Sequence, residues 1–384
     1  MKILYHHRIA SKDGQYVHIE ELINALSSLG HEIILVEPDN LTKKDFGKSS
    51  GLVASIRVFL PGFFHEFVEF CYSFFDFFKV LIKVIKHKPD CIYERYNIFL
   101  VSGVWIKKIF SLPYLVEINA PLFHERGSNH GFQLKTLAHW SEKYVWKNAD
   151  FALPVTGVLA DMVIQAGVDP NKCRVIPNGI NRNAKTLSRN GAFLREQLHL
   201  KGKLVLGFVG FVRTWHRLDR VLTFIHENRD KGFHLLLIGD GPANESLKQQ
   251  AQALNVAEFV SFLGVIDRNS VLDYVDAFDI ALQPDVVNYA SPLKLFEYMM
   301  LGKAILAPNK RNILEVLTDE KDALLFEPSD ESSFSNQLMR LCASQELRSH
   351  LGNEAKKTIE EKKLFWDENA KTVSTLFAKL LDHK

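Results

Sequence analysis

The 384-residue sequence predicts an α/β protein with two doubly wound domains whose loops face a shared cleft. In the first half, short apolar segments alternate with helical patterns, which is typical of parallel sheets with helical crossovers. The same alternation restarts at residue 203 and continues through the second half. Between the halves, Pro177-Asn178-Gly179-Ile180-Asn181 predicts a turn, and polar sequence follows to about residue 202. In such sheets the ligand crevice lies at the carboxyl ends of the strands.

The elements of the first half follow from apolar runs and from the residues that end them. We expect strands at residues 2–5, 32–36, 91–93, 114–117, 151–154 and 174–176. A helix is expected at residues 18–29, where Gly30 ends it, and Gly14 is placed in the loop before it.

The second half gives a further series of strands, at residues 203–209, 233–238, 260–262, 280–283 and 304–307. We therefore expect a first domain at residues 1–182, a hinge at 183–202 and a second domain at 203–362. Residues 363–384 are expected to form a C-terminal helix that returns toward the first domain.

Composition excludes several classes of function. The formal net charge of +2 gives no general argument for binding nucleic acid. The four cysteines are widely spaced and lack metal-ligand or redox spacing, which indicates a reduced, cytoplasmic setting. The polar start predicts a first strand rather than a signal peptide, and no apolar run is long enough to span a bilayer.

The segment at residues 291–302 carries the clearest indication of a ligand. Ser291 suits the N-cap of a helix, Pro292 suits its first position, and Gly302 suits its end. The N–H groups of such a start would bind an anion, for which a diphosphate is the obvious candidate. Glu297 could accept hydrogen bonds from the two hydroxyls of a ribose. A capped amphipathic helix with one buried glutamate is the alternative.

Several segments, in order, resemble the retaining GT-B glycosyltransferases of the large nucleotide-sugar family four. They are residues 14–30, Ile176-Pro177-Asn178-Gly179-Ile180, and residues 207–220, 236–242, 262–264, 291–308 and 312–328. The resemblance implies two Rossmann-like domains, of which the first binds the acceptor and the second binds the nucleotide-sugar donor. It also implies that the anomeric configuration is retained and that neither metal nor cofactor is needed.

Carried over residue by residue, Glu297 matches the second, ribose-binding acid of the family's Glu-x(7)-Glu pattern. Tyr289 occupies the place of the first acid, which leaves the donor sugar open, and Asp285 and Asn288 are nearby polar substitutes. Arg213 matches the phosphate-binding arginine, and either His216 or Arg217 takes the place of the family's lysine. The full set implied for donor binding is Gly14, Gly210, Arg213, His216, Gly239, Asp240, Ser291, Pro292, Leu293, Lys294 and Glu297.

The catalytic residues implied by the resemblance are Arg213, Lys294 and Asn119. Asn119 stands where many relatives have a histidine, and it can hydrogen-bond a sugar hydroxyl but cannot carry a proton. His124 and Glu125 follow closely and are expected to bind the acceptor. A phosphate oxygen of the donor could take the proton of the attacking hydroxyl, so no protein base is obligatory.

Residues 59–88 have the most unusual composition in the chain, with eight phenylalanines between Phe63 and Phe78 followed by Lys79, Lys83, Lys86 and Lys88. Aromatic residues with a basic flank suit a helix that lies in a membrane interface near anionic lipid. The alternative is a buried crossover helix whose phenylalanines fill the core, with exposure only at residues 59–64.

The sequence thus predicts a cytoplasmic transferase that adds a sugar to a glycan or lipid-linked acceptor in polysaccharide or glycolipid biosynthesis. If residues 59–88 lie in a membrane interface, the enzyme is attached peripherally to the inner face of the membrane. A catalytically silent sugar-nucleotide-binding relative and a sugar-nucleotide epimerase of the same architecture are the alternatives. A nicotinamide oxidoreductase is disfavoured because His6-His7-Arg8 follows the first strand in place of a glycine-rich turn. The donor base and sugar, the linkage and the oligomeric state stay open.

Overall fold

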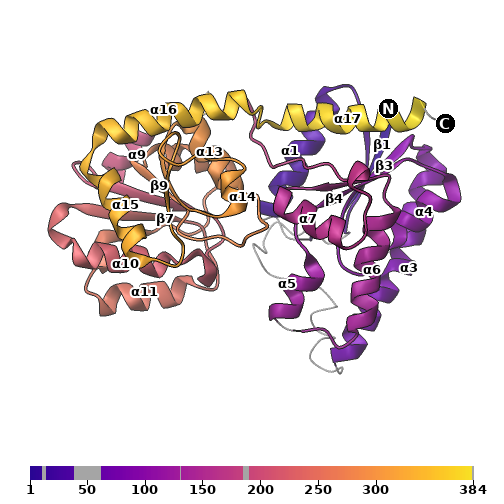
Figure 1. Ribbon diagram of the computed structural model, residues 1–384, viewed down its shortest axis with the longest axis horizontal. Coiled ribbons are helices and arrows are strands. Elements are labelled where there is room, and N and C mark those ends of the chain that lie inside the picture. Colours follow the sequence, from indigo (N-terminus) through magenta and orange to yellow (C-terminus); the bar gives the residue numbers. More distant parts are fainter. Residues whose placement is uncertain (11–13, 39–61, 130, 185–189, 383–384) are drawn as a thin grey trace. The chain divides into compact units, whose positions relative to one another are not determined.

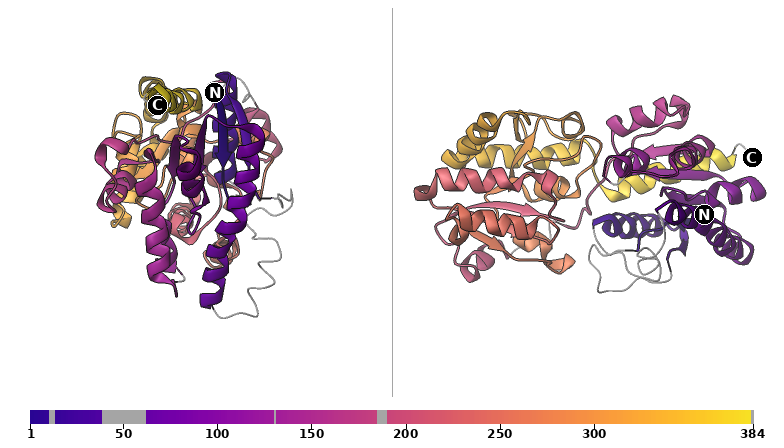
Figure 2. Two further views of the ribbon diagram at one scale, coloured as in Figure 1. Left: turned by 90° about the vertical axis from the view of Figure 1, so that its right-hand side faces the viewer. Right: turned by 90° about the horizontal axis from the view of Figure 1, so that it is seen from below.

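The computed structural model describes residues 1–10, 14–38, 62–129, 131–184 and 190–382 (Figure 1). The chain forms two compact units. Unit 1 comprises Met1–Pro177, Tyr289–Ser291 and Trp366–Lys384, and unit 2 comprises Asn178–Asn288 and Pro292–Phe365. Figure 2 shows helices on both faces of each sheet.

Unit 1 contains a five-stranded parallel sheet with the order β2-β1-β3-β4-β5. Its strands are β1 (Lys2–His6), β2 (Glu32–Val36), β3 (Cys91–Arg95), β4 (Tyr114–Ile118) and β5 (Phe151–Pro154). Its helices are α1 (Gly14–Ser28), α3 (Gly62–His87), α4 (Ser102–Phe110), α5 (Leu122–Asn129), α6 (Lys135–Asn148), α7 (Gly157–Gln165), the short η1 (Pro170–Lys172) and α17 (Trp366–Asp382).

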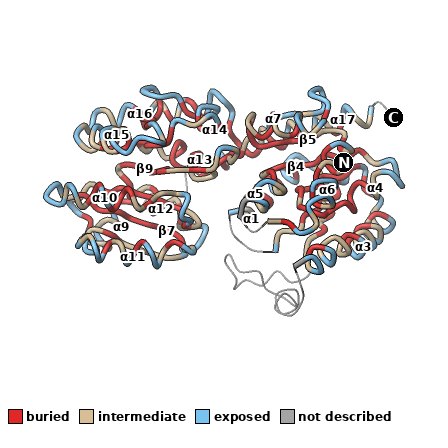
Figure 3. The backbone as a smooth tube through the Cα atoms, turned by 60° about the horizontal axis from the view of Figure 1, so that its bottom comes forward, coloured by how far each residue is buried: buried red, intermediate tan, exposed pale blue. Residues whose placement is uncertain are grey.

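Alternate residues of the unit 1 strands face opposite sides of the sheet. Ile3 and Tyr5 of β1 belong to the apolar cluster formed with α1 and α17. Leu4, between them, belongs to the cluster formed with α3, α4, α6 and α7. Both faces are therefore covered, which accounts for the fully buried pattern of β3 and β4 (Figure 3).

Unit 2 contains a six-stranded parallel sheet with the order β11-β10-β9-β6-β7-β8. Its strands are β6 (Leu204–Val209), β7 (Phe233–Ile238), β8 (Val260–Phe262), β9 (Ile280–Leu282), β10 (Ala304–Pro308) and β11 (Leu324–Phe326). Its α-helices are α9 (Gly191–Gln197), α10 (Leu218–Glu227), α11 (Asn244–Ala253), α12 (Val271–Asp276), α13 (Leu293–Leu301), α14 (Arg311–Leu314), α15 (Glu331–Ala343) and α16 (Gln345–Glu361). Short helices are η2 (Thr214–His216), η3 (Arg229–Lys231), η4 (Ala257–Phe259) and η5 (Arg268–Ser270).

One face of the unit 2 sheet packs on a large apolar cluster. Leu206 and Phe208 of β6 contribute to it together with residues of α10, α11, α15 and α16. The predicted fold class, two doubly wound α/β domains with parallel sheets, is confirmed by the strand order of both units.

Three local predictions are wrong. Residues 174–176 form no strand: the N–H groups of Arg174 and Ile176 bond to β5, but Pro177 lacks an N–H and the pairing goes no further. Gly14 is not in a loop, because α1 begins at this residue. Sequence reasoning also missed the short strand β11.

The stretch 183–202, expected as a hinge, clusters with unit 2, and α9 occupies part of it; residues 185–189 of that stretch lie outside the described residues.

Candidate functional site

The unit 2 sheet has its topological switch point at β6, which pairs with β7 on one side and with β9 on the other. In doubly wound sheets the chains that leave the two strands at such a point run to opposite faces, and this is where ligands bind. The segment 210–217 follows β6, and the segment 283–292 follows β9 and leads into α13. These two segments, together with α13, hold most of the predicted donor residues.

Two glycines allow the backbones after β6 and β7 to touch. Gly239 has φ of +116°, and a Cβ atom there would lie 2.0 Å from the carbonyl oxygen of Gly210. Gly210 has φ of +137°, a conformation that side chains disfavour. A Cβ atom at Gly210 would also lie 3.1 Å from Nζ of Lys294. The glycines therefore let the lysine lie against the end of β6.

Lys294 projects from the first turn of α13 onto this strand end. Its Nζ lies 3.6 Å from the centroid of the Phe208 ring. Burial lowers the pKa of Lys294 to about 7, although Glu297 acts in the opposite direction. With a pKa close to 7, the amine of Lys294 is only partly protonated at neutral pH. A bound anion would favour its protonated, positively charged form.

Arg213 follows β6 and is exposed between two aromatic rings. Its guanidinium carbon lies 4.7 Å from the ring centroids of both Phe211 and Trp215. The backbone N–H of Arg213 donates to Nδ1 of His216 at 3.2 Å. Burial, with the charges of Lys294 and Arg213, lowers the pKa of His216 to about 2, so this imidazole is neutral. The structure thus brings Arg213, His216 and Lys294 to one strand end.

Arg217, the other candidate for the basic position, is engaged elsewhere. Its guanidinium donates to Asp219 and to Glu331 at 2.9 Å, and its backbone has φ of +52° where α10 begins.

Glu297 is buried on α13, with its side chain 8% exposed. Its Oε1 accepts a hydrogen bond from Nη1 of Arg268 at 2.8 Å. Arg268 lies on η5, beyond the end of β8, and is about half exposed. Sequence reasoning missed Arg268, because no local pattern links residues that are 29 positions apart.

The start of α13 differs by one residue from its prediction. Pro292, not Ser291, is the N-cap, and Leu293 is the first helical residue. Proline has no side-chain acceptor, so no side chain caps the first turn. Gly302 ends the helix with φ of +64°, as predicted. Ser291 is buried and belongs to unit 1, whereas Pro292 belongs to unit 2.

Two of the remaining polar candidates for the donor site, Asp240 and Asp285, are held by other side chains. Oδ1 of Asp240 accepts from the N–H of Gly241 and from Asn244, which holds the turn after β7. Asp285, a suggested substitute for the missing first acid, accepts from Lys310 at 2.6 Å, and Asn288 is exposed.

Glu117, at the end of β4 in unit 1, is the centre of a buried polar cluster. Its carboxylate accepts from Arg95 at 2.6 Å and from the hydroxyl of Tyr93 at 2.7 Å, and it pairs with Nε2 of His18 at 2.8 Å. Burial would raise the pKa of Glu117, but His18 and Arg95 hold it below its usual range. Asn119 donates to the same carboxylate, so its amide is oriented by Glu117. Sequence reasoning missed His18, whose partner lies on a different element.

His124 and Glu125 lie in the first turn of α5, where His124 is exposed. The carboxylate of Glu125 accepts a hydrogen bond from the phenol of Tyr289, whose pKa rises through burial and through this contact. The carbonyl oxygen of Tyr289 accepts from Thr156 at 2.9 Å. The residue at the family's first-acid position therefore packs within unit 1 and carries Glu125 as its partner.

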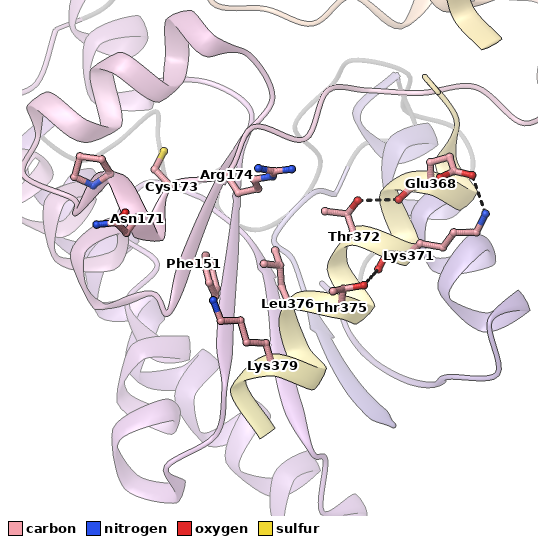
Figure 4. Close-up of a pocket in the computed structure, with 11 residues that line it drawn as sticks. Phe151, Asn171, Cys173, Arg174, Glu368, Lys371, Thr372, Thr375, Leu376 and Lys379 are labelled. Atoms are coloured by element: carbon pink, nitrogen blue, oxygen red, sulfur yellow. Dashed lines mark hydrogen bonds and ion pairs between the residues drawn. The ribbon is translucent and has the colours of Figure 1, made fainter. Parts of the chain in front are cut away.

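A surface cavity of about 560 Å³ lies in unit 1 between α17 and the segment around η1 (Figure 4). Its lining includes Arg174, Lys379 and the ion pair of Lys371 with Glu368 at 2.7 Å. None of the predicted site residues lines it. The cavity therefore adds nothing to the predicted sites.

Two family models match this chain. The model for glycosyltransferase family 4 matches residues 12–184, and the model for glycosyl transferases group 1 matches residues 192–358. The second match contains β6, β7, β9 and α13, and so the switch-point site.

Curated relatives match part of the chain. It is 28% identical over 232 residues to the Escherichia coli UDP-Gal:alpha-D-GlcNAc-diphosphoundecaprenol alpha-1,3-galactosyltransferase, covering 55% of this chain and 58% of that protein. It is 25% identical over 218 residues to the Campylobacter jejuni N-acetylgalactosamine-N,N'-diacetylbacillosaminyl-diphospho-undecaprenol 4-alpha-N-acetylgalactosaminyltransferase, covering 55% and 56%. The chain spans little more than half the length of these relatives.

Among solved structures, the sucrose-phosphate synthase of Thermosynechococcus elongatus matches with a TM-score of 0.79 at 17% identity, covering 100% of both chains. At this identity the match establishes a shared fold.

Proposed function

The chain belongs to the group 1, family 4 glycosyltransferases with the GT-B fold, and from this membership we propose that it transfers a sugar from a nucleoside-diphosphate donor with retention. The observation that carries the proposal is the switch-point site of unit 2. There Arg213, His216 and Lys294 gather at the end of β6, and the buried carboxylate of Glu297 lies on the same helix as Lys294.

In the proposed complex the diphosphate lies against the start of α13, and Glu297 accepts the two ribose hydroxyls. The leaving diphosphate gains negative charge as the glycosidic bond breaks. Fixed cations and N–H groups can stabilise that charge without reorganising. Lys294 and Arg213 supply the cations, and the uncapped N–H groups of the first turn of α13 supply the donors. We propose that this set replaces a metal ion.

The acceptor is proposed to bind unit 1. Asn119 is held by Glu117 and can hydrogen-bond an acceptor hydroxyl, and His124 and Glu125 on α5 can contact further hydroxyls. A phosphate oxygen of the donor takes the proton of the attacking hydroxyl, since Asn119 has no acid–base function. Gly14, at the start of α1, is proposed to contact the donor diphosphate through its backbone.

The two curated relatives are named for acceptors linked to undecaprenol through a diphosphate, and one is named for a UDP-sugar donor. We therefore propose a lipid-linked acceptor in polysaccharide or glycolipid biosynthesis and a cytoplasmic enzyme attached peripherally to the membrane. No helix within the described residues combines the length and apolar character needed to cross a bilayer.

A thermal-shift screen of nucleoside diphosphates tests the donor half of the proposal. At least one nucleoside diphosphate should raise the melting temperature of the wild-type chain, with little effect on Glu297→Ala. Adding a chelator should leave the shift unchanged. If binding were restored to a chelated, inactive protein only by manganese or magnesium, the metal-free arrangement would be wrong.

A further inference from the structure

Helix α3 turns a row of large apolar side chains outward, and its inner face combines the core residues Val80 and Val84 with three buried polar side chains. Glu66, Ser73 and Asp76 are at most 5% exposed. Glu66 accepts from the backbone N–H groups that precede α6. Ser73 donates to a backbone carbonyl, and Asp76 pairs with Nε2 of His6 at 3.0 Å. These contacts fix which face of the helix turns inward.

The outward face is a row of large apolar side chains. Phe67, Phe74, Phe78 and Ile85 are 52%, 50%, 60% and 62% exposed. Their spacing along the helix places them on one line, since residues separated by seven, four and seven positions repeat the helical turn. The alternative of a core-filling helix exposed only at residues 59–64 is therefore wrong for Phe67, Phe74 and Phe78, whereas Phe70 and Phe77 do pack against the core. Residues 59–61 lie outside the described residues, and Phe63 and Phe64 are also exposed.

Neighbouring helices extend this apolar face. Ile109 and Phe110 of α4, which packs against α3, are 60% and 38% exposed, and Trp140 of α6 is 44% exposed. Figure 3 shows exposed and intermediate residues along α3. An exposed apolar surface that spans three helices is unusual on a soluble protein and marks an interaction site.

Cations flank the row on α3 and α4. Lys86 is exposed in the last turn of α3, Lys83 is half-buried one turn earlier, Lys88 is exposed after the end of the helix, and Lys108 is exposed on α4 beside Ile109. Long lysine side chains can reach the phosphates of lipid headgroups while the neighbouring apolar groups enter the interface.

We propose that the exposed face of α3 and α4 docks unit 1 onto the surface of an anionic bilayer. This proposal rests on the proposed function, in which the acceptor is linked to a membrane lipid. The apolar row enters the boundary between headgroups and acyl chains, and the lysines bind the headgroups. The helix is placed in the membrane plane, because Asp76 holds it to His6 of β1 and Glu66 holds it to the segment before α6.

A second copy of the chain suits this face less well. A twofold interface would bring the same patch from both copies together, and with it the same lysines. Anionic lipid supplies the opposite charge, so charge complementarity favours the bilayer.

Co-sedimentation of the full chain with vesicles tests the proposal. The wild type should bind vesicles that contain phosphatidylglycerol, and bind vesicles of phosphatidylcholine alone more weakly. Phe67→Ser/Phe78→Ser/Ile85→Ser should raise the lipid concentration needed for half-binding by at least about tenfold. Lys83→Gln/Lys86→Gln should reduce binding to phosphatidylglycerol at low salt and weaken its salt dependence.

Phe193→Ser on α9 is the matched control, because Phe193 is 59% exposed in unit 2, and it should bind as the wild type does. Equal binding by the triple variant and the wild type, or no binding by the wild type at low salt, would overturn the proposal. The proposal would also be overturned if the wild type formed a dimer, the triple variant were monomeric, and neither protein bound vesicles. Thermal stabilisation of the same variants by a nucleoside diphosphate separates this proposal from the proposed function. If the nucleotide stabilises the proteins but none of them binds vesicles, the membrane-docking proposal is wrong and the donor site is unaffected.

Discussion

Lys294 and Glu297 stand on the same short helix, yet their surroundings differ. Lys294 meets the Phe208 ring and the Gly210 backbone, and burial keeps its pKa near 7. Glu297 has a cation partner, Arg268, in the absence of any ligand. The helix therefore offers a cation for a diphosphate at Lys294 and an oriented carboxylate for ribose hydroxyls at Glu297. A nucleoside diphosphate carries both of these groups.

Binding of a nucleoside diphosphate near pH 8 should take up a proton. In the unliganded protein the pKa of Lys294, about 7, lies below its unfolded value of 10.5, so at this pH the amine is mostly neutral. A diphosphate stabilises the charged form and raises that pKa, so affinity should fall as pH rises above about 7. Calorimetry in two buffers of different ionisation enthalpy measures the uptake. Lys294→Arg should abolish it, and equal heats in both buffers for the wild type would contradict the assignment.

Glu297→Ala should weaken nucleoside-diphosphate binding by ~1.5–3 kcal/mol, because a hydrogen bond to a charged group is lost. The fold should survive, since the partner Arg268 is about half exposed and can be hydrated. Arg268→Ala is the control: it removes the orienting cation but keeps the carboxylate, so its effect should be smaller. Donor affinity unchanged in Glu297→Ala would remove this residue from the site.

At the level of single residues, the helix start predicted at residue 291 and the family resemblance led to Glu297, Lys294 and Arg213 as donor-site candidates, and their roles stay predictions. Sequence reasoning could not locate Arg268 or His18. Their partners are far away in sequence, and only the packing of separate elements brings them together.

At the level of elements, the pair between Asp76 and His6 helps to fix the orientation of α3. His6 at the end of β1 lies between Asp76 of α3 and Glu94 of β3, at 3.0 and 2.7 Å. Burial alone would lower the pKa of His6, but the two carboxylates raise it to about 10. The composition of α3 could not decide between core and surface, because apolar residues lie on both faces: Val80 and Val84 face the core, whereas Phe74 and Phe78 face outward.

The free energy of unfolding should fall as pH rises from about 6.5 toward 10. The pKa of His6 is higher in the folded state than its unfolded value of 6.5, so its stabilising contribution is complete below 6.5 and is lost as pH approaches 10. Urea denaturation across this range measures the decline. Asp76→Asn removes one of the charges that raise the pKa, so its decline should be smaller. An identical slope in the two proteins would show that this pair does not set the pH dependence.

At the scale of the whole molecule, alternation of strands and helices was sufficient to predict two doubly wound units. It was not sufficient to predict which unit holds each connecting segment. Tyr289–Ser291 clusters with unit 1 through contacts such as that of Tyr289 with Thr156, while the flanking residues belong to unit 2. Such contacts leave no periodic pattern in the sequence.

Product analysis tests the central claim most directly. The chain is incubated with a nucleotide sugar, with and without a polyprenyl-diphosphate-linked sugar, and the products are analysed by mass spectrometry. We predict that the acceptor gains one sugar and that nucleoside diphosphate appears in equal amount, only when both substrates are present. A rearranged donor formed without acceptor would indicate an epimerase. Donor that binds but is never consumed across the acceptors tried would indicate a silent binding protein, and either result would contradict the proposed transfer.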